Sequence, residues 1–418
     1  MPYFDMNLNL SWEDQQLKET AHEFARDVMR PIAKEMDQMD PQEAVAPGAP
    51  FWDFMRQAYE MGFHAASLPE AVGGGGLTPL QTHILHEELA WGSHGLATTL
   101  GVAGWPFLTL AMLGNQELID KYVTPFVNCT DGTISGCWGG TEPNHGCDMV
   151  ASDTEFFTKP GVRADCTATL DGDEYVINGT KCAWVSIAPI ATHVQLHLQI
   201  DQDKGMSGQG CFFFPLDLPG ISKGPALDKL GMRELCQGEL FFDNVRLPKS
   251  AMLFEDTGAP FLEQALTKGN MTMAVWATGL ARAAYDEALA YAKERVQGGK
   301  PIIEHDTMKI TLHKMFSRVE TCRAMSRAVF QMNGSIYPGN PEYSFASKTI
   351  CTEMALENAS DAIQVHGGYG LTKEYNTEKW FRDARENTIA DGMNEMLNRK
   401  GGKHLAETYP RVRTTEAK

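Results

Sequence analysis

The stretch THVQLHLQI, residues 192–200, decides the fold class, because it alternates strictly where most of the chain repeats with a helical period. Val194, Leu196, Leu198 and Ile200 are apolar, and the residues between them are histidine or glutamine. A period of two puts the apolar side chains on one face of an extended chain. We therefore predict a strand here, with one face buried and the other half open to solvent.

Other strand signals surround this stretch from about residue 134 to residue 250. ATLDGDEYVINGTK, residues 168–181, holds an Asp-Gly turn between two strand-like runs, and GELFFDNVRLP, residues 238–248, is typical of a closing strand that ends at proline. The sequence predicts a middle antiparallel β domain over residues 134–250.

The residues on both sides of this domain have a helical period. Ser11 and Asp14 form a helix-start signal, and an apolar helical face follows until Pro31 interrupts it. We predict an N-terminal helical domain over residues 1–133. Residues 251–418 contain four long helical runs, the last beginning near Asn394, which is enough for an antiparallel four-helix bundle. The fold class is α+β, in the order helical, β, helical.

Bulk composition excludes several classes of function. At 418 residues the chain is too long for one ordinary core, and 43% hydrophobic with 22% charged residues describes a globular protein. No apolar run is judged to approach the roughly 20 residues of a membrane span, and the N-terminus has no export signal, so we expect a cytoplasmic protein. Nine cysteines without a CxxC pair suit reduced thiols and no metal site. A formal net charge of -18 argues against nucleic-acid and membrane partners.

Four motifs occur in a fixed order along the chain. They are GGTEPNHGCD at 139–148, INGTKCAWVS at 177–186, ERVQGGKPIIEH at 294–305, and QVHGGYGLTKEY at 364–375 followed by WFRDAR at 380–385. Each also has a reading from its residues alone. Pro143 and Gly146 hold an irregular loop that frees backbone N–H groups and the Thr141 hydroxyl for a polar ring edge, although a plain interstrand loop fits too. The paired glycines after His366 allow close approach to a pyrophosphate, although a helix C-cap accounts for one of them.

Together the motifs and the helical–β–helical order resemble the acyl-CoA dehydrogenase family nearly end to end. The resemblance implies FAD as cofactor, an acyl-CoA substrate, an electron-transfer flavoprotein as electron acceptor, and a homotetramer in which neighbouring subunits hold the ADP half of FAD. The cofactor residues that it implies are Trp138, Gly140, Thr141, Trp184, Val185, Ser186, Arg295, Gln364, His366, Gly367, Gly368, Met393 and Glu395. The substrate residues that it implies are Cys147, Lys268, Gly269, Asn270 and Gly392.

Asp391, in TIADGMNEML at 388–397, is the candidate catalytic residue. From the local sequence it could be a helix cap. Aligned on the family's RD-x-x-x-x-x-I-x-E-G pattern, it stands where the family has its catalytic glutamate, which removes the α proton of the thioester while a hydride leaves Cβ for flavin N5. Such a base must be desolvated, and the developing enolate needs hydrogen bonds to the thioester oxygen. In the family the N–H at the base position, here residue 391, supplies one of them.

The sequence departs from the family at several positions. Aspartate is one methylene shorter than glutamate, and the family's other base position falls at Gly269. Asn270 stands in place of an arginine, Gly298 in place of an aromatic residue near the adenine, and Met393 in place of a threonine. Gly269, Asn270 and Ala183 together predict a pocket without its usual side chains, which would suit a broad acyl group, branched or cyclic.

Two other functions stay open at this point. The same residues would serve an enoyl-CoA reductase running the reverse reaction, and a chain whose Asp391 is too short to act would be a silent subunit of a mixed oligomer. Two further strings are interpreted structurally. His83, His86 and Glu87 could form a metal face but are expected to be ordinary packing, and the glycines at 73–76 are expected to form a turn.

Overall fold

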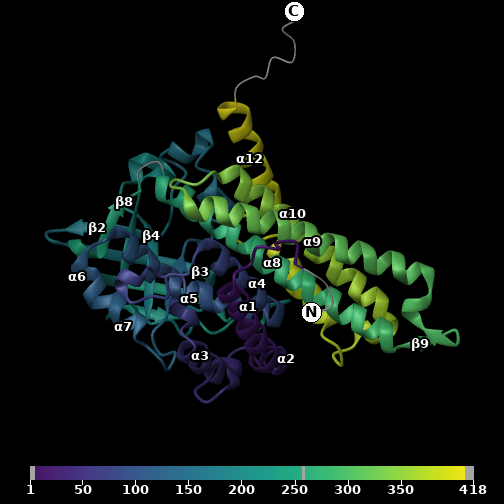
Figure 1. The fold of residues 1–418 in the computed structure, drawn as a ribbon. Coiled ribbons are helices and arrows are strands. Elements are labelled where there is room, and N and C mark those ends of the chain that lie inside the picture. The colour runs from purple at the N-terminus through teal and green to yellow at the C-terminus, as the bar shows by residue number, and fades with distance from the viewer. Residues whose placement is uncertain (1–4, 257–258, 410–418) are drawn as a thin grey trace, which may run out of the picture.

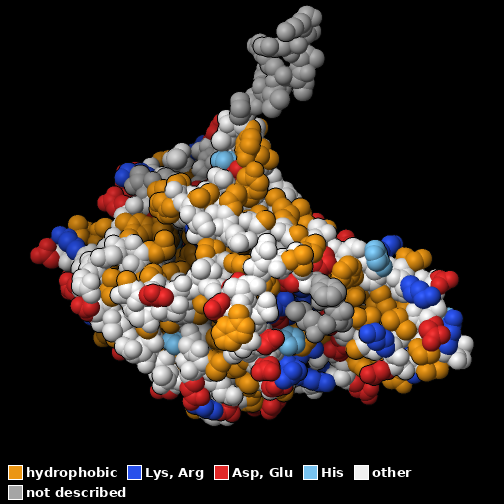
Figure 2. Space-filling view, viewed as in Figure 1, with side chains coloured by type: hydrophobic (Ala, Val, Ile, Leu, Met, Phe, Trp, Pro, Cys, Tyr) orange, Lys and Arg blue, Asp and Glu red, His pale blue; other side chains and the backbone are white. Residues whose placement is uncertain are grey.

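The computed structural model describes residues 5–256 and 259–409. N-terminal helices, a twisted sheet and a group of long helices follow one another along the chain, and the long helices run side by side away from the sheet (Figure 1). On the face drawn in Figure 2, a hollow edged by hydrophobic side chains opens between the strands and the C-terminal helices.

The N-terminal region is helical, as predicted. Its helices are α1 Trp12–Phe24, α2 Arg30–Met36, α3 Pro50–Glu60, α4 Pro79–Gly92, α5 His94–Leu113, α6 Gln116–Leu118 and α7 Thr124–Val127. Ser11 and Asp14 form the expected reciprocal cap at the start of α1. The predicted interruption at Pro31 is wrong, because a π-helical turn, Ala25–Met29, joins α1 to α2. Pro31 stands in the first turn of α2, where a missing N–H costs little.

Helix α5 corrects the statement that no apolar run approaches membrane length. It has 20 residues and is apolar enough to cross a membrane by length and composition. In the structure, however, 61% of its most apolar window is buried inside the protein. It packs against α4, α8 and β1, so its apolar character is explained by its place in the core.

The middle region is an eight-stranded sheet. The strands are β1 Gly136–Gly139, β2 Thr167–Asp171, β3 Glu174–Ser186, β4 His193–Gln199, β5 Gln209–Pro215, β6 Ile221–Lys223, β7 Gln237–Pro248 and β8 Met252–Glu255. Their order is β6-β7-β3-β2-β4-β5-β8, with β1 beside β4. Neighbouring strands are antiparallel at all but two pairings. The two parallel pairings are those of β4 with β1 and of β4 with β2. The sheet extends past residue 250, because β8 pairs with β5.

Strand β4 is the period-two stretch that predicted the sheet, but its polar face is not open to solvent. Gln195, His197 and Gln199 are each at most 2% exposed. The ring of Phe261, at the start of α8, stacks on His197, and Trp138 of β1 meets the same imidazole edge-on. Alternation predicted the strand correctly, but it could not reveal that a second layer covers the polar face.

The C-terminal region holds α8 Pro260–Glu294, α9 Asp306–Ser335, α10 Pro341–His366, α11 Thr377–Asn387 and α12 Asn394–Thr408. Helix α10 packs on α8, α9, α11 and α12, which gives the predicted bundle with α11 as an additional helix. A small hairpin of β9 Val296–Gln297 and β10 Lys300–Pro301 lies at the end of the bundle far from the sheet (Figure 1).

Helix α4 joins the N-terminal region to the bundle through buried ion pairs. Arg282 of α8 contacts Glu87 and Glu88, and His83 bonds the hydroxyl of Ser326 at 2.9 Å. His86 accepts a hydrogen bond from the Trp276 indole at 3.0 Å. The side chains suggested as a metal face therefore have packing partners, in agreement with the structural interpretation.

Candidate active site

Asp391 lies in the short loop between α11 and α12. Its φ is 53° and that of Gly392 is 94°, so the chain makes successive left-handed residues here. A non-glycine residue rarely adopts this conformation, and such strain often occurs at functional sites. Helix α12 begins at Asn394 with Met393 as its N-cap, which makes no side-chain capping bond. Asp391 is therefore two residues too early to be the cap.

Two helices hold this loop from opposite sides. From α8, the Asn270 amide donates to the main-chain oxygen of Asp391 at 3.3 Å. From α10, the Lys348 ammonium donates to the main-chain oxygen of Gly392 at 3.0 Å and to Oδ1 of Asn394 at 2.8 Å. The main-chain N–H of Asp391 has no hydrogen-bond acceptor among the described residues. This donor is available at the position where the family binds a thioester oxygen.

Gly269 of α8 faces the Asp391 carboxylate. A Cβ atom placed on Gly269 would lie 3.6 Å from Oδ2 of Asp391 and would meet nothing else within 4 Å. The glycine thus leaves open space directly beside the carboxylate. Any side chain at this position would fill that space.

The environment of Asp391 raises the pKa of its carboxyl group. Desolvation by the surrounding protein is the larger cause, and the Lys348 charge opposes it. The residue is nevertheless exposed to solvent. Both observations hold for a side chain that lines a recess, where protein atoms surround the carboxylate but water still reaches it. A ligand that displaced this water would raise the pKa further.

The loop after β1 carries the next group of predicted residues. Trp138 lies on β1, and its indole N–H is buried without a partner among the described residues. The Lys181 ammonium bonds the main-chain oxygen of Gly140 at 3.0 Å, and the N–H of Cys182 bonds that of Thr141 at 3.0 Å. The main-chain carbonyl groups of Gly140 and Thr141 therefore fix this loop against β3. The side-chain hydroxyl of Thr141 is left for another contact.

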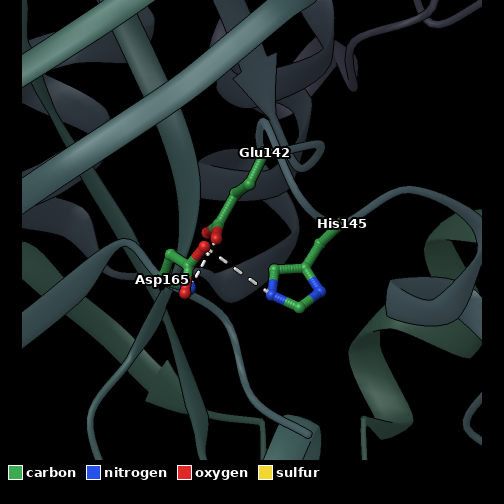
Figure 3. Close-up of side chains that lie close together, drawn as sticks. All are labelled: Glu142, His145 and Asp165. Carbon is green, nitrogen blue, oxygen red and sulfur yellow. Dashed lines mark hydrogen bonds and ion pairs between the residues drawn. The ribbon is translucent and has the colours of Figure 1, made fainter.

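Glu142, His145 and Asp165 lie close together behind this loop (Figure 3) and have the residue types of a metal site. The Glu142 carboxylate, however, already pairs with the Lys181 ammonium at 2.6 Å and accepts the N–H groups of Asp165 and Cys166 at 2.5 and 3.2 Å. His145 bonds Asp148 at 2.6 Å. These contacts explain the cluster as the support that shapes the loop.

Strand β3 has a bulge at the predicted flavin strand. Its register with β7 shifts between Lys181 and Val185, and Ala183 has a φ of 28°. A bulge redirects the side chains that follow it and is common next to active sites. Trp184 is 57% exposed, Val185 is buried, and Ser186 accepts a hydrogen bond from Gln237. The bulge therefore lies within the predicted INGTKCAWVS motif.

A separate cavity of about 660 Å³ lies at the far end of the bundle. It brings together all the residues predicted for the ADP half of FAD, namely Arg295, Gln364, His366, Gly367 and Gly368. Tyr291 stacks on His366 at 4.0 Å, and the Arg295 guanidinium lies over the Tyr369 ring. The ring of His305 lies against Gly298, where an added Cβ would be 3.3 Å from it.

The predicted site residues thus fall into distinct groups. Gly269, Asn270 and Gly392 surround Asp391, and Cys147 is close enough for its charge to act on Lys348. Met393 and Glu395 are exposed at the start of α12. Lys268 bonds the main-chain oxygen of Asn333 in α9, so its ammonium is engaged by another helix.

Sequence reasoning missed Lys348. The available signal was a lysine inside SFASKTIC, residues 344–351, a run with no other charge on a helix expected to be packed. Lysine is almost never fully buried without a partner. A search for charged residues within apolar helical runs would have found it.

The sequence matches models of three consecutive regions of one family. These are described as the N-terminal, middle and C-terminal domains of acyl-CoA dehydrogenase, and they match residues 11–130, 137–245 and 256–406.

Whole-chain similarity agrees with this. The chain is 32% identical to a probable acyl-CoA dehydrogenase of Bacillus subtilis, over 94% of this chain and 97% of the relative. It is 30% identical to the mitochondrial short-chain specific acyl-CoA dehydrogenase of Bos taurus, over 94% and 90%. The structure of butyryl-CoA dehydrogenase from Megasphaera elsdenii superimposes with a TM-score of 0.83 at 27% identity, covering 96% of this chain and 100% of that one. The chain therefore belongs to the acyl-CoA dehydrogenase family, flavoproteins that use FAD to oxidise the α,β bond of acyl-CoA thioesters.

Proposed function

We propose that Asp391 is the general base of this enzyme, and that the substrate is a short acyl-CoA whose acyl group is branched or cyclic. The observation that carries the proposal is the position of Asp391. The surrounding protein desolvates its carboxylate, and the neighbouring helix α8 places only Gly269 beside it. A desolvated carboxylate is a stronger base than one in water.

The chain's own groups account for the proton chemistry. The Asp391 carboxylate accepts the α proton of the thioester and becomes a neutral acid. The Asp391 N–H, which has no acceptor among the described residues, donates to the thioester oxygen as negative charge develops there. Bound FAD supplies the acceptor for the hydride from Cβ.

The residues near β1 and β3 fit a flavin ring. The buried indole N–H of Trp138 has no partner among the described residues, and a buried donor in this state calls for an acceptor. The Thr141 hydroxyl, together with Trp184, Val185 and Ser186 on the bulged strand, completes the group assigned to the ring. Arg295, Gln364, His366, Gly367 and Gly368 are assigned to the ADP half.

The distance between these groups supports an oligomer. Gly269, beside Asp391, and Arg295, at the end of α8, are 26 positions apart, which is roughly 39 Å of helix at about 1.5 Å per residue. One FAD molecule cannot span that length, so the ADP half at one active site is held by the bundle end of another subunit. We assign the protein as a homotetramer of this kind.

The substrate, electron acceptor and compartment are proposed on different grounds. Gly269 and Asn270 leave lateral space for a branch or ring, and a curated relative named as short-chain specific supports a short acyl group. Family membership supports an electron-transfer flavoprotein as electron acceptor. All nine cysteines are free, which suits a reducing cytoplasm.

The decisive experiment is Asp391→Asn. The amide is nearly isosteric, so fold and bound FAD are retained, but it cannot take a proton. The rate of flavin bleaching by a panel of acyl-CoA thioesters, measured by stopped-flow absorbance, is expected to fall by about 10²–10⁴-fold relative to the parent. The matched control is Asp173→Asn, which removes a 99% exposed carboxylate from the sheet.

The same panel tests the alternatives. A parent protein that binds FAD but is bleached by no thioester would be a silent subunit. An Asp391→Asn variant that bleaches as fast as the parent would place the base elsewhere. A parent whose reduced flavin is reoxidised by an enoyl-CoA faster than acyl-CoA bleaches the oxidised form would be a reductase.

A further inference from the structure

Lys348 is a buried charge directly behind the Asp391 loop. It lies in the middle of α10 and is 0% exposed. Burial of an ammonium group is costly unless hydrogen bonds and an opposite charge compensate for it. The neighbours of this ammonium therefore indicate what the charge does.

Its hydrogen bonds all go to the segment that follows the base. The ammonium bonds the main-chain oxygen of Gly392 and Oδ1 of Asn394. Thr352, one turn further along α10, exchanges hydrogen bonds with the same Asn394 side chain, at 3.1 and 3.4 Å. Lys348 and Thr352 thus form one clamp on the loop, in which Lys348 carries a charge and Thr352 does not.

The charges that face Lys348 come from several elements. Burial lowers the pKa of the ammonium to about 8, and Asp391 opposes this shift most among the carboxylates, followed by Glu395 of α12 and Glu353 of α10; the Cys147 side chain of the middle region also faces it. From α8, the nearest groups to the loop are Gly269 and Asn270, neither of which titrates. Lys348 is in turn the only charge that acts appreciably on the Asp391 carboxyl group among the described residues.

We propose that Lys348 is a positioning residue for the general base. Its ammonium fixes the left-handed loop through Gly392 and Asn394, and these bonds place a positive charge one residue from the base. The inference rests on the proposed role of Asp391. It adds a residue that contacts neither substrate nor cofactor and acts only through Asp391.

The charge balance explains why such a residue is useful. Desolvation raises the pKa of the Asp391 carboxyl group, since burial disfavours the charged form, and this reduces the fraction of ionised base at low pH. A neighbouring ammonium offsets this without taking part in the proton transfer. Burial lowers the pKa of the Lys348 ammonium to about 8, so most molecules carry this charge at pH 7.

The test is Lys348→Met, which removes the charge and keeps the length of the side chain. Loss of an opposite charge raises the pKa of Asp391, so fewer molecules hold an ionised base at low pH. The acid limb of the flavin-reduction rate against pH, measured by stopped flow on the FAD-loaded enzyme, is expected to move up by about one pH unit. Lys348→Arg, which keeps the charge, is expected to retain the parent limb even if the rate falls.

The matched control is Thr352→Val. It weakens the clamp on Asn394 without changing any charge, so it is expected to lower the rate equally at all pH values and leave the limb in place. The proposal is overturned if the acid limb of Lys348→Met coincides with that of the parent. It is also overturned if the acid limb of Thr352→Val shifts as far as that of Lys348→Met.

A second measurement needs no activity and covers a variant that folds poorly. Without Lys348 the partly desolvated Asp391 carboxylate has no opposite charge to compensate it, so Asp391→Asn is expected to raise the melting temperature of Lys348→Met more than that of the parent at pH 7. Below about pH 4, where the carboxyl is protonated in the folded and unfolded states, this difference should vanish. If Asp391→Asn raised the melting temperature of Lys348→Met and of the parent equally at pH 7, the coupling between Lys348 and Asp391 would be refuted. If Asp391→Asn itself still bleaches, the role of Asp391 fails, and this stability cycle still reports on the pair.

Discussion

At the scale of a single residue, the environment of the Asp391 carboxylate disfavours its charged form. Its pKa is raised mainly by desolvation, only partly offset by Lys348. A carboxyl group whose pKa is higher in the folded state binds protons more tightly there, so it lowers stability as pH rises above its unfolded value of about 3.9. The ionised Asp391 carboxylate therefore lowers the stability of the folded protein at neutral pH.

This predicts a pH-dependent gain from Asp391→Asn. The variant is expected to melt at a higher temperature than the parent at pH 7, and the difference should shrink to zero as the pH falls below about 4. Asp153→Asn is the control with the opposite sign. Burial opposes its ionisation, but Arg399 and Lys400 outweigh burial and lower its pKa, so its substitution should cost stability at pH 7. Calorimetry from about pH 3 to pH 8 checks both; a loss of stability in Asp391→Asn at pH 7 would contradict this prediction.

At the scale of elements, α5 and α8 approach closely where Gly101 meets the ring of Trp276. A Cβ placed on Gly101 would lie 2.5 Å from that ring, and Trp276 is itself fixed by its bond to His86. The contact therefore leaves no room for a side chain at position 101.

Gly101→Ala is accordingly expected to destabilise the protein by about 1–3 kcal/mol through overpacking, despite the better helix propensity of alanine. In a Trp276→Phe background, where the ring is smaller, the same change should cost less. Gly402→Ala in α12 is the control, because its Cβ would meet nothing within 4 Å. Free energies of unfolding from denaturant titration give the comparison, and equal costs in the parent and Trp276→Phe backgrounds would rule out the contact as the cause.

Much of the element order was predictable because it depends on local pattern. The alternation from Val194 to Ile200 predicted β4, and the Ser11 cap predicted the start of α1. What depends on distant packing was not predictable. The covered face of β4 follows from Phe261, and the clamp on Asp391 follows from Lys348, 43 positions earlier in the chain. Asp391 was assigned through a motif, and Gly269 and Asn270 through the family's other base position on the helix that opens the bundle. Neither the local pattern nor the family resemblance could reveal the contact of Lys268 with Asn333.

At the scale of the whole molecule, the bundle end and the recess around Asp391 lie too far apart to serve one cofactor. Arg295→Ala is expected to lower the retention of FAD and the stability of the oligomer together, because the guanidinium lies at the cavity that would hold a neighbour's pyrophosphate. FAD content per chain and mass by light scattering measure the two effects. Arg246→Ala, an exposed arginine on the sheet, is the control. Unchanged mass with unchanged flavin content would contradict the shared site.

The length of α8 also has a genetic consequence. Under the proposed assembly, each chain contributes its Asp391 to one active site and its Arg295 to another, so defects in the two residues affect different parts of a site. In an oligomer assembled from Asp391→Asn chains and Arg295→Ala chains, some sites receive both defects and others receive neither. Two inactive alleles of this protein should therefore complement each other when expressed in one cell, whereas two alleles altered at Asp391 should not.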